Sequence, residues 1–465
     1  MPASREGREA VFERYSIPRA VVTLSVPTVL SSLVSVLYSL ADTYFVGLLN
    51  NPVQTAAVTL AAPVLLAFNA VNNLFGVGSS SMMSRAYGRK DFDTLRRSSA
   101  FGFYGALCSG AVFALLCTVL RSPLLGLLGA NEVTRAATNS YLNWTVSIGA
   151  VPAILNVVIA YMIRSEGAAL HASIGTMSGC LLNIVLDPIF ILPWGLGLGA
   201  AGAAMATCFS NCCALVYFLV YLATHRKTTL VCVSPKAFSL RRDIVGGVCA
   251  VGVPASIQNL LNVTGTTILN NLAAPYGAAA LAAMGICSRL SMVPMYISMG
   301  ISQGVMPLIS YNYASKNIRR MKDTLFYAAR ISISFLALMA LVFFCFPGVF
   351  VRMFIENAET LSYGMRFLRG MSLAVPLLGV DFLAVGIFQA VGMGKQALIF
   401  AIMRKIVLEI PFLYLLNWMF PLYGIAYAQA ASELVMAITA VTVLLRFLKR
   451  AEKESLALAS APGSV

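Results

Sequence analysis

The sequence predicts an all-α membrane protein with about twelve transmembrane helices arranged as two six-helix lobes. Three observations predict this fold class. Of the 465 residues, 59% are hydrophobic and 11% are charged, and the mean hydropathy is +0.81. Apolar segments of about 20 residues, the length that crosses the hydrocarbon core of a bilayer, recur along the chain. Similar segments in the two halves of the chain indicate that one set of helices is duplicated.

The predicted spans are helices because lipid offers the backbone no hydrogen-bond partner outside the segment itself. The short alternating strands of a closed barrel are not found in the sequence. In chain order, the predicted spans cover residues 17–46, 54–83, 98–120, 136–163, 170–192, 198–223, 244–272, 277–310, 325–347, 364–391, 396–418 and 421–446.

The duplication appears as three pairs of similar segments at nearly one spacing. An even number of spans in each copy makes both copies enter the membrane from the same side, so a pseudo-two-fold axis along the membrane normal relates the lobes. The predicted domains are an N-lobe (1–223), an inter-lobe cytoplasmic loop (224–243), a C-lobe (244–450) and a flexible tail (451–465). The paired segments are AYGRKDFDTLRR (86–97) with NYASKNIRRMKD (312–323), SVPTVLSSL (25–33) with GVPASIQNL (252–260), and LGAAGAAMA (198–206) with YGIAYAQAA (423–431).

The net charge is +15, and the positions of the basic residues along the chain indicate the membrane topology. Of the 33 lysines and arginines, 27 lie at the N-terminus, in or beside the even-numbered connections, or at the C-terminus. Positive charge marks the cytoplasmic side, so we expect a multi-pass plasma-membrane protein with both termini and residues 224–243 in the cytoplasm. This distribution gives no reason to expect a nucleic-acid partner.

Two acids lie in segments that are otherwise apolar. Asp187 follows Asn183 by four residues in NIVLDPIF, which places both on one helix face. An ionisable group at this depth costs roughly 2.5 to 3.5 kcal/mol, so it reads first as part of an ion or substrate path. Amide and carboxylate oxygens suit a hard cation or a proton. Asp42 shares a helix face with Tyr38. The structural alternative is that each acid is satisfied by its neighbours, Asp187 as a helix-end acid beside Pro188.

The predicted architecture also restricts the source of energy. Two parallel six-helix bundles with a cleft between them predict transport by rocking about a site at mid-membrane. The sequence contains no G-x-x-x-x-G-K-[ST] phosphate loop, and the nearest segment, VGMGKQ (391–396), lacks its first glycine and its hydroxyl residue. Ion-gradient coupling is therefore favoured over ATP hydrolysis. We expect no organic cofactor and no metal centre beyond a possible Na+ as the coupling ion. The ten cysteines show no zinc-binding spacing.

Six motifs distributed over nearly the whole chain resemble the multidrug and toxic compound extrusion (MATE) transporters, in their bacterial-type branch. The resemblance implies twelve helices in two lobes and the export of cationic or amphipathic drugs and other toxic compounds in exchange for Na+ or H+. The protein is thus expected to be a transporter and not an enzyme. The motifs are LADTYFVG (40–47), IRSEGAA (163–169), NIVLDPIF (183–190), GLGAAGAAMAT (197–207), PLISYNYASKNIRR (307–320) and FQAVGMGK (388–395).

The resemblance also assigns the coupling site. In the family, an aspartate of the first helix, an Asn-x-x-x-Asp motif of the fifth and a threonine of the sixth converge in the N-lobe. Asp42, Asn183 and Asp187 match these positions, and Thr207 is the nearest candidate for the threonine. The resemblance therefore implies that these four residues bind the coupling cation or proton.

The C-lobe departs from this pattern. Alignment of the seventh span on the first places Leu269 opposite Asp42. Asp381 and Glu409 are the possible additional acids of this lobe. As an alternative to a coupling role, Glu409 pairs with Arg404 or Lys405, about one helical turn away.

Substrate contacts are expected on two polar or adaptable helix faces and on Tyr38. Gln258, Asn262, Thr266 and Asn270 recur every four residues on the seventh span, a polar face that lipid would not accommodate. Met292, with other methionines of the eighth span, suits varied apolar ligands through its flexible thioether, although a packing seam explains these methionines equally well.

Three functions from different classes follow from the sequence. The first is cation-coupled drug export by a monomer in the lipid bilayer, with small-molecule drugs as partners. The second is a flippase for lipid-linked precursors of the same superfamily, which usually requires more spans and a cationic cavity. The third is an integral-membrane enzyme, for which the sequence offers no paired histidines and no H-E-x-x-H motif.

Overall fold

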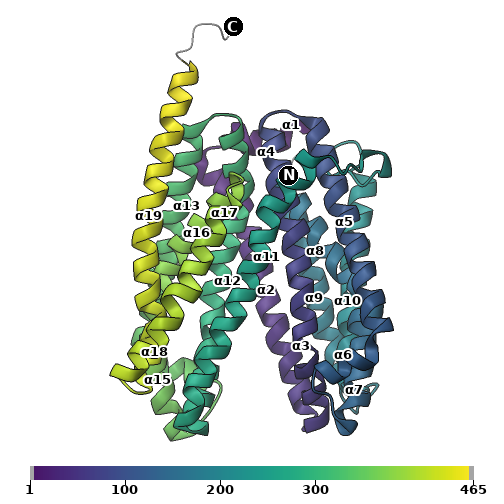
Figure 1. Ribbon diagram of the computed structural model, residues 1–465, viewed down its shortest axis with the longest axis vertical. Coiled ribbons are helices and arrows are strands. Elements are labelled where there is room, and N and C mark those ends of the chain that lie inside the picture. Colours follow the sequence, from purple (N-terminus) through teal and green to yellow (C-terminus); the bar gives the residue numbers. More distant parts are fainter. Residues whose placement is uncertain (1–4, 460–465) are drawn as a thin grey trace. The chain divides into compact units, whose positions relative to one another are not determined.

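The structure is a computed structural model that describes residues 5–459, and every regular element in this part of the chain is a helix (Figure 1). The chain forms two compact units. The first contains the residues up to Arg14 together with Leu30–Ser256, and the second contains Tyr15–Val29 together with the residues from Ile257 onward. Two of the three boundaries between the units therefore fall inside helices, in α2 (Ile17–Leu48) and α11 (Arg242–Ala273), and the third falls between Arg14 and Tyr15.

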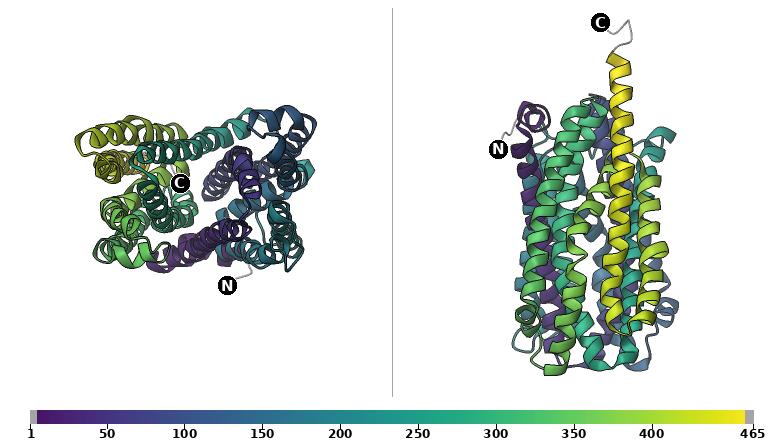
Figure 2. Two further views of the ribbon diagram at one scale, coloured as in Figure 1. Left: turned by 90° about the horizontal axis from the view of Figure 1, so that it is seen from below. Right: turned by 90° about the vertical axis from the view of Figure 1, so that its left-hand side faces the viewer.

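The long helices of the first unit run side by side (Figure 2). Its elements other than α2 and α11 are given below in chain order. Three of the elements are short π-helical or 3-10 segments, labelled η. The elements are α1 (Arg5–Glu13), α3 (Pro52–Asn72), η1 (Asn73–Val77), α4 (Gly78–Gly88), α5 (Phe92–Val119), α6 (Arg121–Leu127), α7 (Glu132–Leu142), η2 (Asn143–Ile148), α8 (Ala150–Ser165), α9 (Ala169–Ile191), α10 (Gly199–Thr224) and η3 (Pro235–Ala237).

The second unit has a similar order of helices, although the interruptions fall at different places. The last helix, α19, continues as far as Ala459, so residues 451–459 of the expected tail are helical, while 460–465 lie outside the described residues. The elements after α11 are η4 (Ala274–Tyr276), α12 (Ala278–Ala314), α13 (Ile318–Cys345), α14 (Pro347–Arg352), α15 (Ala358–Ser372), α16 (Val375–Ala390), α17 (Gly394–Ile402), η5 (Met403–Glu409), α18 (Ile410–Met419) and α19 (Tyr423–Ala459).

The helices have the length and composition of membrane spans. Nine are long and apolar enough to cross a bilayer within the described residues, and two bent helix pairs raise this number to eleven. A twelfth run consists of α17, η5 and α18, where the π-helical turn and three charged residues interrupt the apolar pattern. The all-α membrane fold class predicted from the sequence is confirmed.

Helix starts and bends recur at corresponding places in the two units. Asp91 and Asn317 each cap a helix by accepting a hydrogen bond from a backbone N–H three residues ahead, and each follows a lysine with positive φ. Asn131 and Asn357 cap the next pair of long helices in the same way. The helix pairs that follow these two caps bend by 49° and 45°. The repeat seen in the sequence is therefore also a repeat of local structure.

Two glycines allow α2 and α11 to pack closely within the units that they enter. A Cβ added at Gly78 of α4 would lie 2.5 Å from the carbonyl oxygen of Val248 in α11. At the equivalent position of the second unit, a Cβ at Gly304 of α12 would lie 2.6 Å from the Cα of Ser25 in α2. Backbone-to-backbone contact at these points requires glycine in both copies.

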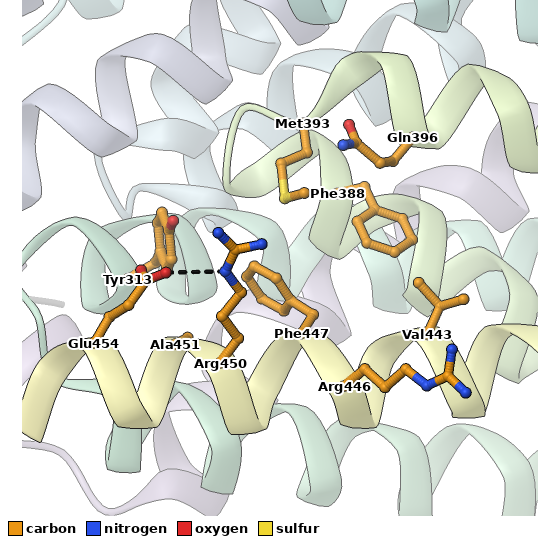
Figure 3. Close-up of a pocket in the computed structure, with 10 residues that line it drawn as sticks. All are labelled: Tyr313, Phe388, Met393, Gln396, Val443, Arg446, Phe447, Arg450, Ala451 and Glu454. Carbon is orange, nitrogen blue, oxygen red and sulfur yellow. Dashed lines mark hydrogen bonds and ion pairs between the residues drawn. The ribbon is translucent and has the colours of Figure 1, made fainter.

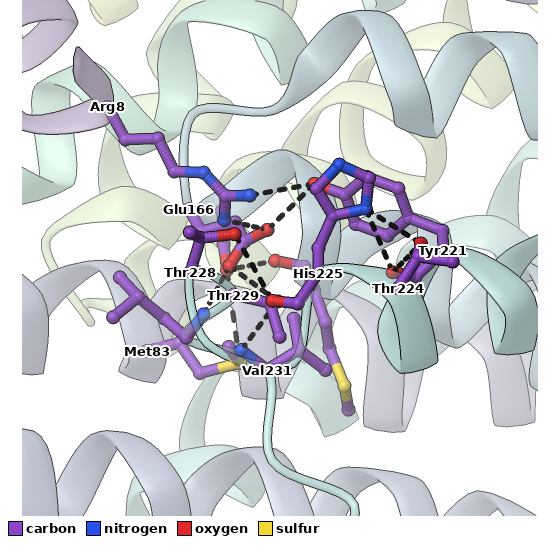
Figure 4. Close-up of polar contacts among 12 residues, drawn as sticks. Arg8, Met83, Glu166, Tyr221, Thr224, His225, Thr228, Thr229 and Val231 are labelled. Atoms are coloured by element: carbon purple, nitrogen blue, oxygen red, sulfur yellow. Dashed lines mark hydrogen bonds and ion pairs between the residues drawn. The ribbon is translucent and has the colours of Figure 1, made fainter. Parts of the chain in front are cut away.

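A buried polar cluster joins four segments at one end of the first unit (Figure 4). Glu166, just after α8, forms an ion pair with Arg8 of α1 and accepts hydrogen bonds from Tyr221, Thr229 and the Leu230 backbone N–H at 3.3, 2.9 and 2.6 Å. All of these segments belong to regions that the charge pattern predicts to be cytoplasmic. The cluster therefore fixes them together at the same end of this unit.

Candidate functional site

Three helices bring together, within the first unit, the residues predicted to bind the coupling ion. Tyr38 and Asp42 lie on α2, Asn183 and Asp187 lie on α9, and Thr207 lies on α10. The side chains meet because α9 and α10 pack against each other along their lengths, while α2 approaches at Ser35, whose hydroxyl lies 3.7 Å from Cys180 Sγ on α9.

The threonine connects the other side chains. Thr207 Oγ1 lies 3.3 Å from Asn183 Nδ2, which donates to it, and 3.4 Å from the Tyr38 hydroxyl. The predicted set of Tyr38, Asn183 and Thr207 is thus joined by hydrogen bonds. This arrangement fixes the Asn183 amide, whose Oδ1 is buried and has no partner within the described residues.

Asp187 lies one helical turn beyond Asn183 on the same face of α9, and its carboxylate is unusually buried. The residue is 0% exposed, and neither carboxylate oxygen has a hydrogen-bond partner within the described part of the chain. Pro188 follows directly and has no backbone N–H, so the carbonyl of Ile184 also loses its helical partner. Buried polar groups are normally hydrogen-bonded, so a proton or cation bound at these oxygens would stabilise them.

Asp42 completes the site from α2. Its side chain is half-buried and lies close enough to Asp187 for the two charges to interact. If both carboxylates were ionised, they would repel each other. A proton or a cation between the two carboxylates removes this repulsion. Together with Asn183 Oδ1, the site offers oxygen ligands of the kind that hard cations prefer.

Tyr141, at the end of α7, is a site residue that the sequence reasoning missed. It is 5% exposed, and its hydroxyl lies within the electrostatic range of Asp42, Asp187 and Tyr38. No motif or spacing in its segment indicates this position. The position results from the packing of α7 against α3 and α10.

The two additional acids of the second unit have cationic partners. Asp381 on α16 lies 3.1 Å from Arg404 of η5, and Arg404 also contacts Glu433 of α19 at 2.8 Å. Glu409 pairs with Lys405 at 2.7 Å, as the sequence alternative proposed. These acids therefore differ from Asp187, which forms no ion pair with any of the described residues.

The residues on the polar face of α11 differ in their burial and in their contacts. Gln258 accepts a hydrogen bond from Gln389 of α16 at 3.2 Å, so it contributes to packing inside the second unit. Asn262 is half-buried, and Thr266 is exposed. Asn270 is half-buried, with an Oδ1 that lacks a partner among the described residues. Leu269, opposite Asp42 in the repeat, packs against the apolar core of this unit.

The methionines of α12 divide into two groups. Met284 is 0% exposed and belongs to the hydrophobic core of the second unit, together with Phe367 and Leu368. Met292 is 37% exposed and is therefore accessible from outside the unit.

Two duplicated helical units, spans of membrane-crossing length and a buried carboxylate within one of these spans are features of a membrane transporter. Comparison with known proteins agrees with this class. The profile of the MatE family matches residues 27–189 and 254–415, once in each half of the chain and at the spacing of the internal repeat. The chain belongs to the MatE family, that of the MATE transporters.

The relatives have similar lengths and folds. The chain is 32% identical to the multidrug export protein MepA of Staphylococcus saprophyticus, over 93% of this chain and 94% of that protein. It is 31% identical to MepA of Staphylococcus aureus over the same shares of the two chains. A solved outward-facing multidrug resistance MATE family transporter is 25% identical, covers 97% of this chain and 99% of its own, and superimposes with a TM-score of 0.91.

Proposed function

We propose that this protein is an antiporter that exports cationic or amphipathic drugs in exchange for sodium ions or protons. The observation that carries the proposal is the buried Asp187 carboxylate, whose oxygens have no hydrogen-bond partner among the described residues. Such a group needs a bound cation or proton, and a site that binds one reversibly across the membrane can couple transport to a gradient. The names of the relatives, which are multidrug exporters, support the substrate class.

In the proposed mechanism, Asp42 and Asp187 act as one binding unit for the driving ion. Asn183 supplies a third oxygen, and Thr207 and Tyr38 hold the amide in place. Release of the ion leaves two like charges in a poorly solvated pocket, which destabilises that conformation relative to the loaded one. The ion thus biases an equilibrium between two transporter states through its different affinity for each.

Substrate contacts are assigned to accessible side chains of the second unit. Thr266 and Met292 are exposed, and Asn262 and Asn270 are half-buried on the same unit. The thioether and the amides offer apolar and polar contacts to varied ligands. Gln258, which is bonded to Gln389, is assigned the positioning of α11 beside α16.

The coupling site is tested by transport into vesicles with sodium and proton gradients imposed one at a time. Asp42→Asn and Asp187→Asn should each abolish gradient-driven export, and the double variant should lose little more than either single variant, because residues that act as a unit are not additive. Asp243→Asn is a matched control, since this exposed acid at the start of α11 lies outside the site. Near-normal export by either single variant would exclude the proposed site. Dye transport in vesicles without lipid-linked precursors separates drug export from the flippase alternative.

We further propose that both termini and residues 224–243 face the cytoplasm and that the protein works as a monomer. In a cysteine-free background, Lys227→Cys should not react with a membrane-impermeant thiol reagent in intact cells, because the positive charge of this loop retains it inside. Reaction in intact cells would reverse the proposed orientation. Cross-linking of the protein in its native membrane tests the monomer, and efficient recovery of dimers would contradict it.

A further inference from the structure

A cavity of about 520 Å³ lies beside the last helix of the second unit, apart from the acid pair (Figure 3). Its floor is apolar and includes the buried Phe388 and the side chains of Met393 and Phe447. Tyr313 and Phe388 both contact Phe447, with ring centroids 6.0 and 6.5 Å apart. Arg446, Arg450 and Glu454 of α19 supply the charged part of the lining. The cavity thus combines an aromatic floor with two guanidinium groups.

The position of these arginines along α19 places the cavity at the surface of the bilayer. The helix begins at Tyr423, and Arg446 follows 446 − 423 = 23 residues later. At about 1.5 Å per residue this distance is roughly 35 Å, slightly more than the hydrocarbon thickness of about 30 Å. Arg446 and Arg450 therefore lie at the level of lipid headgroups, and Val443 of the same lining lies one turn nearer to the hydrocarbon.

The charges of the lining favour an anion. Arg446 makes no ion pair within the described part of the chain. Arg450 pairs with Glu454 at 3.1 Å, but the two side chains are 82% and 61% exposed, so this pair is weak and readily exchanged. Glu452, the other acid of this turn, is not part of the cavity lining and pairs with Lys322 of α13 at 3.0 Å. The lining therefore carries a surplus positive charge in the planar form that matches phosphate oxygens.

We propose that this cavity binds an anionic phospholipid. Arg446 and Arg450 contact its phosphate, and the first part of an acyl chain lies against Phe388, Met393 and Val443. Basic pockets between transmembrane helices at one membrane face bind lipid headgroups by the same chemistry. The apolar floor distinguishes this site from a simple cluster of surface arginines, because a free phosphate ion would leave that floor exposed to water.

The proposal is tested with the purified full-length protein in a neutral detergent, titrated with phosphatidylglycerol, phosphatidylcholine or inorganic phosphate. The thermal unfolding midpoint should rise with phosphatidylglycerol only. The Arg446→Gln/Arg450→Gln double variant should bind phosphatidylglycerol about thirtyfold more weakly, as expected for the loss of two cations near an anionic headgroup. Glu454→Gln should bind it more tightly, because the competing carboxylate is removed from Arg450.

The matched control is Lys449→Gln/Lys453→Gln, which removes the same charge from the same helix but does not touch the cavity lining. It should keep the phosphatidylglycerol affinity of the unmodified protein. An equal loss in both double variants would show diffuse electrostatic attraction and overturn the proposal. Equal stabilisation by phosphatidylcholine, or by inorganic phosphate, would overturn it as well. Asp187→Asn should retain the lipid effect, which separates this site from the coupling site.

Discussion

At the residue scale, burial changes the ionisation of Glu166 at the end of the first unit. Burial raises the pKa of its carboxyl group, while the Arg8 guanidinium and the three hydrogen bonds from Leu230, Thr229 and Tyr221 oppose that rise. The residue is 1% exposed and Arg8 is 6% exposed, so solvent screens their attraction little. A group with a raised folded pKa contributes stability below its unfolded pKa and loses it as the pH rises through the folded value.

We therefore predict a pH-dependent defect in the Arg8→Gln variant. Without the guanidinium, the pKa of Glu166 rises further, and ionisation above it leaves a buried charge without its partner. The variant should be less stable than the unmodified protein, and the difference in thermal midpoint should be larger at about pH 8 than at about pH 5. Thermal unfolding in detergent at the two pH values measures this. Arg97→Gln, which removes an exposed pair with Asp93, serves as the control. A difference that is independent of pH would contradict the prediction.

At the scale of elements, the π-helical segment η5 determines the charge arrangement of the second unit. A π turn carries more residues than an α turn, so it presents a wider face to the interior. Arg404 and Lys405, which are adjacent in the sequence, are both buried here, and each reaches a different carboxylate. Arg404 also lies over the Phe382 ring, 5.2 Å from its centroid.

The two kinds of buried acid should respond differently to substitution. Arg404→Met leaves Asp381 and Glu433 without their cation and should destabilise the protein by about 3 to 5 kcal/mol. Asp187→Asn removes a charge that has no described partner, so it should leave the thermal midpoint unchanged or raise it. Both variants are compared by thermal unfolding in one detergent. If Arg404→Met were as stable as Asp187→Asn, the ion pairs of η5 would not be required for the fold.

The sequence predicts elements better than it predicts their contacts. Hydropathy predicts the helical membrane class, and the repeated segments predict the duplication. Both patterns can be recognised in the sequence without knowing how the helices pack. The four-residue spacing of Asn183 and Asp187 also predicts their shared helix face. The approach of Tyr141 to the acids and the pairing of Arg8 with Glu166 depend on the packing of helices far apart in the chain. Glu433 behaves likewise, since its segment gives no sign that it faces Arg404.

At the scale of the whole molecule, two of the three crossings of the chain between the two units lie inside helices. The first crossing inside a helix falls at Val29 and Leu30 in α2, and the second falls at Ser256 and Ile257 in α11, at equivalent positions of the repeat. Movement of one unit relative to the other can therefore be accommodated by bending or rotation of these two helices. The sequence-based division of the chain at the loop 224–243 gives no indication that α2 and α11 each contribute to both units. No break in hydropathy marks the crossing points inside these helices.

Each of these helices carries a proline close to its crossing point, Pro27 in α2 and Pro254 in α11. Proline removes one backbone hydrogen bond, to Thr23 and to Ala250 respectively, and lowers the energy needed to bend the helix there. Pro27→Ala and Pro254→Ala restore these bonds. Each variant should keep or raise the thermal midpoint while lowering the turnover of gradient-driven export several-fold.

Export rates in vesicles, normalised to the amount of folded protein, measure this effect. The control is Pro307→Ala in α12, whose proline also lies inside a helix but within one unit only. Pro307→Ala should leave the export rate unchanged once that rate is normalised to the amount of folded protein. If the variants at Pro27 and Pro254 exported at the normal rate, bending at the crossing points would not limit transport. The conformational change would then have to occur in the non-helical crossing between Arg14 and Tyr15, or without any rearrangement of the shared helices.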